Sequence, residues 1–303
     1  MSKSVGKSSS KLSDTADNKT DQFRLSKQQL KLLDFMYTYR FVTTKQVQRF
    51  LGKQQVQQAQ QRLNTLLAKE YIGKNFSSDD RLLGRYASYF LLPNGLALLK
   101  YNGDPKALKL MRKDATASER FVTHCIAIGD VAADLLRLYH DAESIQFSTK
   151  TELMREDYNT WDGSDDHEFI YNYFPQPLPD GSLNFYRDID DDDHHCFVEV
   201  WQDTIPFWVY RKRIQYYIEY TDEGAWGDAN SVAKQPPVLL VCDSPTLQRR
   251  VQRYLKRIVD EIDSDELKFL VVNRELLAKA EADAAIWHTY DEDQEKFVIC
   301  KLN

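Results

Sequence analysis

Two acidic side chains in the second half of the sequence have the chemistry needed to hold a divalent cation beside a phosphate. Asp180 follows Pro179, and Glu199 comes later, inside an apolar run. Carboxylate oxygens suit Mg²⁺, which stabilises negative charge on a phosphate. Lys212 follows on the next predicted helix, and a side chain of that length can reach across the groove between a helix and a sheet.

The order of these residues resembles the core of nucleases of the PD-(D/E)xK kind. In those enzymes an Asp at the end of one strand and a Glu on the next hold the ion, and a Lys two residues further on helps position the attacking water and the scissile phosphate. The resemblance implies catalytic roles for Asp180, Glu199 and Lys212, with Asp180 and Glu199 as the metal ligands. Lys212 would act from the following helix, because Trp201 occupies the usual lysine position. Glu152 could supply a further carboxylate.

A structural interpretation of the same residues stays open. Glu199 could be an edge-strand carboxylate, Asp180 a turn former and Lys212 a solvated helix residue. We favour a degenerate nuclease fold that binds without cutting over an active metal site. Reading of DNA would then require no cofactor, and Mg²⁺ would be needed only if the nuclease-like site is active.

The other metal-binding residue types form no compact site in the sequence. Asp190 to Asp193 precede His194 and His195, but the run lies where a hairpin is expected to turn, so we interpret it as a solvated acidic loop. The four cysteines lie far apart without C-x-x-C spacing. This disfavours a zinc ribbon and a disulfide framework, and it favours buried or half-buried thiols.

The elements that must position the carboxylates have the pattern of an α/β domain. Helical spacing of apolar residues predicts a long helix over 118–139. Candidate strands are SIQFST, LNFYRDI, HCFVEVW, PPVLLVC and LKFLVV, with helices at 208–220 and 246–262. The alternation predicts a small mixed sheet with helices on both faces, of restriction-endonuclease-like type. The fold class is α/β, or α+β when the whole chain is considered.

The preceding region has the element order of a winged helix-turn-helix. Two capping-box spacings, Ser26 with Gln29 and Thr43 with Gln46, begin a first helix that ends near Arg40 and a short second helix. A glutamine-rich third helix follows in QQVQQAQQRLNTLLAKEY. The runs IGKNF and RLLGRYASYFLL then form a hairpin around the turn SSDD, before a short fourth helix.

Polar groups on the third helix and cations around the hairpin are candidate DNA contacts. Gln can bond the N6/N7 edge of adenine in two places and Arg the O6/N7 edge of guanine, although Gln is also a good helix former. The predicted base or backbone contacts are Gln55, Gln58, Gln61, Arg62 and Thr65, and the predicted phosphate contacts are Lys53, Lys74, Arg81 and Arg85. The alternative is a winged helix that binds protein.

Charge is divided unevenly along the chain. Up to Asp114 there are 21 Lys and Arg against 9 Asp and Glu, whereas the remainder has 19 against 37. The net charge of −6 therefore averages a cationic front half, which suits nucleic acid, and an anionic back half. DNA is not expected to wrap the whole anionic half. A local basic groove is expected there around Arg249, Arg250, Arg253, Lys256 and Arg257.

The length of 303 residues suggests two domains. We predict a disordered tail at 1–21, a winged helix-turn-helix DNA-binding domain at 22–103, a linker at 104–117 and a nuclease-like domain at 118–303. No apolar run approaches membrane-spanning length, and the hydrophilic N-terminus lacks the apolar middle of a secretory signal. We therefore expect a cytoplasmic protein that does not bind membranes.

This order of parts resembles the replication-relaxation family of plasmid and mobile-element proteins, which pair an N-terminal winged helix with a nuclease-like C-terminal domain. The resemblance covers about residues 25–258. It rests on the segments FVTTKQVQRFLG, QRLNTLLAKEYI, SYFLLPNGLALL, THCIAIGDVAADLL, LPDGSLNFYRDI, FVEVW and KRIQYYIEY. In the last segment the family usually has a lysine and a tyrosine, here Lys212 with Tyr216 or Tyr217. Trp201 departs from the family, which often has an acidic residue there.

The sequence therefore predicts a protein that binds specific sites in double-stranded DNA of a plasmid or mobile element and acts in replication, copy control or mobilisation. Its C-terminal domain would hold a partner such as a replication or mobilisation protein, form a homodimer, or engage DNA structure at an origin. One alternative is a Mg²⁺-dependent DNA endonuclease or nickase that uses Asp180, Glu199 and Lys212. Another is a protein adaptor or transcriptional regulator.

Overall fold

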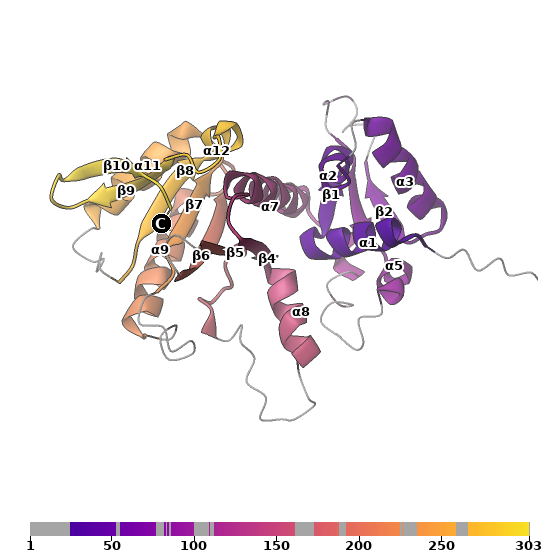
Figure 1. Cartoon of the computed structure of the whole chain (residues 1–303), viewed down its shortest axis with the longest axis horizontal. Helices are drawn as coiled ribbons and strands as arrows, with labels where there is room; N and C mark the ends of the chain where they lie inside the picture. The colour runs from indigo at the N-terminus through magenta and orange to yellow at the C-terminus, as the bar shows by residue number, and fades with distance from the viewer. Residues whose placement is uncertain are drawn as a thin grey trace, which may run out of the picture.

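The computed structural model describes residues 25–52, 55–76, 82, 84, 86–99, 109, 112–160, 173–187, 192–224, 226, 235–258 and 266–302. These residues form a small unit and a larger sheet, with helix α7 (Glu119–Leu138) lying between them (Figure 1). The predicted tail and the candidate contacts Lys53, Arg81 and Arg85 lie outside the described residues. No helix in the described ranges combines the length and the apolar character needed to cross a membrane.

The small unit arranges helices around a three-stranded antiparallel sheet. Its elements are α1 (Lys27–Tyr39), β1 (Phe41–Thr43), α2 (Thr44–Phe50), α3 (Val56–Ala68), β2 (Ile72–Asn75), β3 (Ser88–Leu91) and α5 (Pro93–Leu98). The strands lie in the order β1-β3-β2. The predicted order of three helices, two hairpin strands and a fourth helix is confirmed. Strand β1 was not predicted, because three residues are too few to show an alternating pattern.

Both predicted capping boxes are present. The Ser26 hydroxyl accepts a hydrogen bond from the Gln29 N–H, and the Gln29 side chain accepts one from the Ser26 N–H. Thr43 and Gln46 form the same pair of bonds at the start of α2. These bonds satisfy N–H groups that would otherwise lack partners, so they fix where each helix begins. The core behind the helices includes Leu33, Met36, Val47, Leu63, Leu66 and Tyr89.

The second unit is built on a seven-stranded mixed sheet. Its elements after α7 are β4 (Ser144–Thr149), α8 (Lys150–Thr160), β5 (Gly181–Arg187), β6 (Asp192–Trp201), α9 (Phe207–Asp222), β7 (Val238–Cys242), α11 (Pro245–Arg257), β8 (Phe269–Asn273), α12 (Arg274–Lys279), β9 (Trp287–Asp291) and β10 (Lys296–Cys300). The strand order is β10-β9-β8-β7-β6-β5-β4. Strands β6, β7 and β8 are parallel, and the other pairings are antiparallel.

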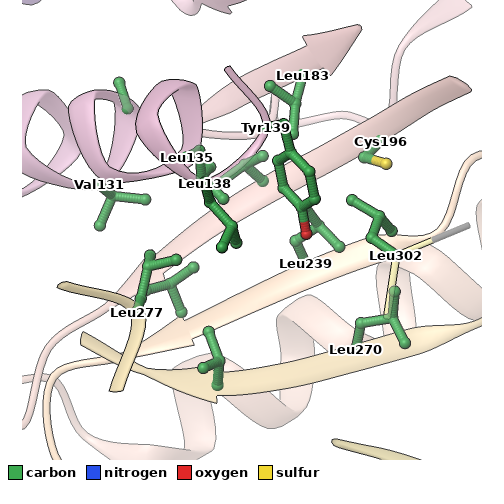
Figure 2. Close-up of a cluster of buried hydrophobic side chains, with 14 of the residues drawn as sticks. Val131, Leu135, Leu138, Tyr139, Leu183, Cys196, Leu239, Leu270, Leu277 and Leu302 are labelled. Carbon is green, nitrogen blue, oxygen red and sulfur yellow. The ribbon is translucent and has the colours of Figure 1, made fainter. Parts of the chain in front are cut away.

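Helices cover both faces of this sheet, as the sequence predicts. On one face α7 and α12 pack against alternate residues of β5 to β8, and Figure 2 shows Leu135 and Leu138 of α7 directed toward the strands, with Val131 nearer to Leu277 of α12. On the other face α9 and α11 pack against the intervening residues of β6, β7 and β8. The central strands are apolar on both sides because both sides are buried, the usual condition of parallel strands.

The interpretation of residues 190–195 as a solvated loop is corrected in part. Asp192 to His195 belong to β6, and the strand register places His194 opposite Phe185 and His195 opposite Asn184. The His194 ring stacks on Phe185 with 4.8 Å between centroids. Antiparallel pairing with β5 extends further than the acidic sequence suggests, because the ladder satisfies backbone groups whatever the side chains are. Asp190 and Asp191 lie outside the described residues.

Polar contacts join the small unit to the larger one. The Gln46 side chain donates from Nε2 to the Ile126 carbonyl (2.8 Å) and to Asp130 Oδ1 (3.0 Å) on α7. The Thr149 hydroxyl donates to the Thr38 carbonyl (2.9 Å). These buried or half-buried bonds join the small unit to α7 and to the end of β4. The predicted division at residue 118 stays a prediction.

Candidate functional site

Helix α3 directs most of its predicted contact residues toward solvent. Gln55, Gln58 and Gln61 are exposed, whereas Arg62 and Thr65 are half-buried. The Thr65 hydroxyl donates to the Gln61 carbonyl (3.0 Å), so it is already used within the helix. Within the described part of the chain, the side chains of Gln58, Gln61 and Arg62 make no hydrogen bond or ion pair. Their donors and acceptors are therefore available to a ligand.

One glutamine of α3 has a different role. Gln60 accepts a hydrogen bond from the Thr44 hydroxyl (3.2 Å) and donates to the Tyr89 hydroxyl (3.1 Å) and to Asn64 (3.0 Å). It thereby ties α3 to α2 and to strand β3. Because one edge of the helix is fixed in this way, the exposed edge with Gln58 and Arg62 is held in a defined orientation.

The hairpin contributes one described candidate contact. Lys74 lies in β2, is exposed, and places its Nζ 5.1 Å from the centroid of the Phe76 ring. The exposed side chains Leu82 and Tyr86 follow it along the chain. The structure thus brings α3 and Lys74 into one unit, and it gives no position for Lys53, Arg81 or Arg85.

Asp180 is a buried carboxylate whose oxygens all have donors. Its Oδ1 lies 3.0 Å from His124 Nε2 and 3.3 Å from Lys150 Nζ, and its Oδ2 accepts the Val200 N–H at 2.9 Å. Burial alone would raise the pKa of Asp180, but Lys150, His124 and the Val200 N–H hold it well below its ordinary value. Asp180 is therefore ionised and serves as the common acceptor for α7, α8 and β6.

The position of Asp180 follows from the residue after it. A Cβ at Gly181 would come within 2.3 Å of the Phe147 ring on the neighbouring strand β4. Only glycine allows this approach, which pairs Gly181 with Thr149 at the start of β5. The carboxyl group one residue earlier lies within reach of the side chain of Lys150, the first residue of α8.

Glu199 is held by α9. Its Oε1 accepts hydrogen bonds from Arg213 Nε (2.8 Å), Arg213 Nη2 (2.6 Å) and the Tyr217 hydroxyl (2.8 Å). The three side chains are buried. Burial, and next the charge of Glu199, raise the pKa of Tyr217 well above its ordinary value, so the tyrosine stays a donor. Strand β6 is interior to the sheet, so Glu199 is not an edge-strand carboxylate.

The structure brings Asp180 and Glu199 into one polar cluster but leaves Lys212 outside it. Lys212 is exposed, with its Nζ 5.4 Å from the centroid of the Tyr216 ring. Arg213, the next residue, reaches Glu199 instead. The signal for Arg213 was present in the sequence, since it lies three residues after Tyr210 and four before Tyr217, on the buried stripe of α9.

Glu152 also lies outside this cluster. Its Oε1 accepts from the Thr38 hydroxyl (3.2 Å), and its Oε2 accepts from the Thr149 N–H (3.1 Å) at the start of α8. Glu152 therefore caps a helix and touches the small unit. His124, which the sequence did not single out, contacts Asp180 instead. Burial alone would lower the pKa of His124, but the bond to Asp180 raises it above its ordinary value.

The donor set around the two carboxylates does not fit Mg²⁺. A divalent ion would have to displace Lys150 and His124 from Asp180, and it would lie beside the Arg213 guanidinium that pairs with Glu199 Oε1. Among the described residues, no group of three or more His, Cys, Asp or Glu is arranged to hold a metal ion. No reaction step through a metal ion follows from this arrangement. The cysteines agree with the sequence prediction, since all four are free thiols, three buried and Cys300 half-buried.

The fold and these two groups of residues define an α/β protein with an exposed glutamine-bearing helix in one unit and a buried ionic cluster in the other. The model of the replication-relaxation family matches residues 33–235. This is more than half of the chain, which therefore belongs to that family, and the predicted resemblance is confirmed. No curated protein matches the chain. Membership indicates a role in the replication or relaxation of plasmids or other mobile elements.

Proposed function

We propose that the chain binds duplex DNA of a plasmid or other mobile element through α3 and acts in replication, copy control or mobilisation. The observation that carries this proposal is the free polar edge of α3. Gln58, Gln61 and Arg62 offer amide and guanidinium groups that no other described residue engages. Such groups match the base edges in the major groove, into which a helix of this size fits.

The arrangement of the small unit supports a winged-helix docking mode. In that mode the third helix enters the groove, and the hairpin that follows it lies along the phosphate backbone. Here α3 is followed by β2 and β3, and Lys74 on β2 carries an exposed ammonium group. The excess of Lys and Arg over Asp and Glu up to Asp114 would draw this half of the protein toward DNA.

The Asp180–Glu199 cluster supports a scaffold role for the second unit. His124 on α7, Lys150 on α8 and Arg213 on α9 all contact one of the two carboxylates, so the cluster connects three helices to strands β5 and β6. The nuclease alternative draws no support from carboxylates that cationic side chains already engage. We propose that this unit engages a partner, a second copy or DNA structure without cutting.

The first experiment is fluorescence anisotropy of labelled duplexes, one from DNA flanking the gene and one scrambled, titrated at several salt concentrations with and without Mg²⁺. A denaturing gel of each sample then reports cleavage. We expect specific, salt-sensitive binding with intact DNA. Cleavage that requires Mg²⁺ and is lost in Asp180→Ala would replace the proposal by the nickase. Affinity without salt dependence, or no affinity, would favour the protein adaptor.

The assignment of α3 is tested with the double variant Gln58→Ala/Arg62→Ala. The matched control is Arg120→Ala, which removes the same charge from an exposed position at the start of α7. The double variant is expected to lose its preference for the flanking duplex, whereas the control keeps it. An unchanged preference in the double variant would remove the assignment of α3 as the recognition helix.

A further inference from the structure

The outer face of α11 carries five cations and no carboxylate. Arg249, Arg250, Arg253, Lys256 and Arg257 are all exposed, and the helix contains no Asp or Glu. Within the part of the chain that the structure describes, none of these five side chains forms an ion pair. The face therefore presents a concentrated positive charge to solvent.

This concentration contrasts with the rest of the second unit, where cations generally have acidic partners. Arg213 pairs with Glu199, Arg274 with Asp243 and Asp130, and Lys279 with Glu275. Acidic residues outnumber basic ones by 37 to 19 after Asp114, so carboxylates are plentiful. Like charges four residues apart, as in Arg249 and Arg253, destabilise a helix. Lys256 Nζ does donate to the Glu295 carbonyl (2.8 Å), but no described carboxylate neutralises the charge of this face, which therefore points to an anionic ligand.

The bonds within α11 leave the cationic groups accessible. Arg253 Nε donates to the Arg249 carbonyl and Arg257 Nε to the Arg253 carbonyl, each at 3.2 Å. Each bond uses only one nitrogen of a guanidinium group, which has five N–H donors. The remaining donors of Arg253 and Arg257 stay free for phosphate oxygens, which Arg binds through two parallel hydrogen bonds.

Helix α9 begins next to α11 and adds an exposed aromatic side chain. Phe207 at its start contacts α11, with the Arg250 guanidinium 4.3 Å from its ring centroid and the Tyr254 ring 5.9 Å away. The next residue, Trp208, is 60% exposed, and one turn later Arg211 and Lys212 are also exposed. We call Trp208, Arg211 and Lys212 together with the five cations of α11 the α9–α11 surface.

We propose that the α9–α11 surface binds single-stranded DNA. Cationic side chains attract the phosphates, and an exposed indole can stack on a base whose face is not covered by its neighbours, as in a single strand. A duplex hides the faces of its bases, so it would make no use of Trp208. This surface is distinct from α3, which lies at the opposite end of the molecule (Figure 1). The proposed function enters only in the choice of DNA as the anionic polymer.

The two surfaces together would let one molecule hold a duplex site and a nearby opened strand. Opened strands occur wherever DNA replication or relaxation begins, so the inference fits the family to which the chain belongs. The α9–α11 surface also explains why a unit with a large acidic excess would still approach DNA, because the excess is absent from this one face.

The test uses the full chain and a fluorescein-labelled thirty-nucleotide oligo(dT), titrated by anisotropy at several salt concentrations. The triple variant Arg249→Ala/Arg253→Ala/Arg257→Ala is expected to lose at least about tenfold in affinity. The slope of log affinity against log salt should fall by about 2, because three phosphate contacts disappear. Trp208→Ala is expected to lose roughly tenfold with the salt slope unchanged, which identifies stacking. Circular dichroism checks that each variant is folded.

Matched variants separate this inference from the proposed function. Gln58→Ala/Arg62→Ala should bind oligo(dT) as the unmodified chain does, and the α11 triple variant should keep its preference for the specific duplex. The inference is overturned if the folded triple variant binds oligo(dT) unchanged. It is also overturned if poly-L-glutamate, or vesicles containing phosphatidylserine, compete as well as oligo(dT) at equal charge, because the surface would then bind any polyanion.

Discussion

The free edge of α3 and the Asp180–Glu199 cluster are two groups of polar residues that look equally suited to function in the sequence. In the structure Gln58, Gln61 and Arg62 are free of side-chain partners among the described residues, whereas every oxygen of Asp180 has a donor. Residue type and spacing select candidates, but the contacts already made decide which of them can still bind a ligand.

The buried cluster also has a different energetic role from the exposed edge. A buried carboxylate is tolerated only where cations and hydrogen-bond donors replace its lost hydration. Arg213 and Tyr217 do this for Glu199, and Lys150, His124 and the Val200 N–H do it for Asp180. Removal of one member should therefore affect folding, whereas removal of an α3 side chain should affect binding alone.

The largest predicted effect comes from breaking the pair on α9. Arg213→Met leaves Glu199 buried without its cation, which should lower the free energy of unfolding by about 3–5 kcal/mol. Urea unfolding followed by circular dichroism measures the loss. The control is Lys212→Met, the exposed neighbour, for which a change within about 0.5 kcal/mol is expected. Equal stability of the two variants would show that the cluster does not hold the unit together.

The second largest effect concerns DNA binding by the exposed edge of α3. Arg62→Ala should weaken binding to the preferred duplex by about 1–3 kcal/mol, the contribution of one base contact. Its urea midpoint should stay at that of the unmodified chain, because no described residue depends on the Arg62 side chain. Anisotropy and urea unfolding on the same preparation measure the affinity and the stability of the variant. A large fall in stability with unchanged affinity would assign Arg62 to the fold.

A smaller effect is expected from a helix cap in the small unit. Thr43→Ala removes the hydroxyl that accepts the Gln46 N–H, and it should cost about 1 kcal/mol of unfolding free energy. Thermal unfolding and urea unfolding measure it. Thr116→Ala is the control, because its exposed hydroxyl bonds only to a carbonyl three residues earlier. If the two variants lose equal stability, the capping box contributes little to the small unit.

The smallest effect is a dependence of stability on pH. The pKa of His124 is raised above its ordinary value of 6.5. The contribution of His124 to folding stability is therefore complete below about pH 6.5 and is lost as pH rises through the raised pKa. The lowered pKa of Asp180 acts in the opposite direction. Its contribution to stability is present above pH 3.8, the ordinary pKa of the group, and is lost as pH falls through the lowered pKa. The side chain of His124 is 29% exposed, so solvent screens the interaction.

Urea unfolding at about pH 5.5 and about pH 8.5 measures this dependence, and His124→Asn should reduce the loss of stability at the higher pH. Titration of His124 should leave the DNA affinity of α3 unaffected, because glutamine does not titrate and arginine stays charged. An affinity that falls together with stability over this range would show that the two units are coupled.

Much of the fold was predictable because it is encoded locally. Capping boxes at Ser26 and Thr43 marked two helix starts. Apolar runs of strand-forming residues correctly predicted five strands of the large sheet. Elements without a strong local signal were missed, namely β1, α8, α12 and the hairpin β9–β10. His194, directly before the predicted strand HCFVEVW, was assigned to a loop, because its pairing depends on a partner strand.

The candidate site was predictable in part. Sequence alone determined which residues carry carboxylates, amides and cations, and it placed Asp180 shortly before one strand and Glu199 on the next. Tertiary structure decided the rest. The rotation of α9 about its own axis directs Arg213 rather than Lys212 at Glu199. The packing of α7 and α8 brings His124 and Lys150 to Asp180. These partners are distant in sequence, and burial makes their charges depend on one another, so only the packed structure fixes them.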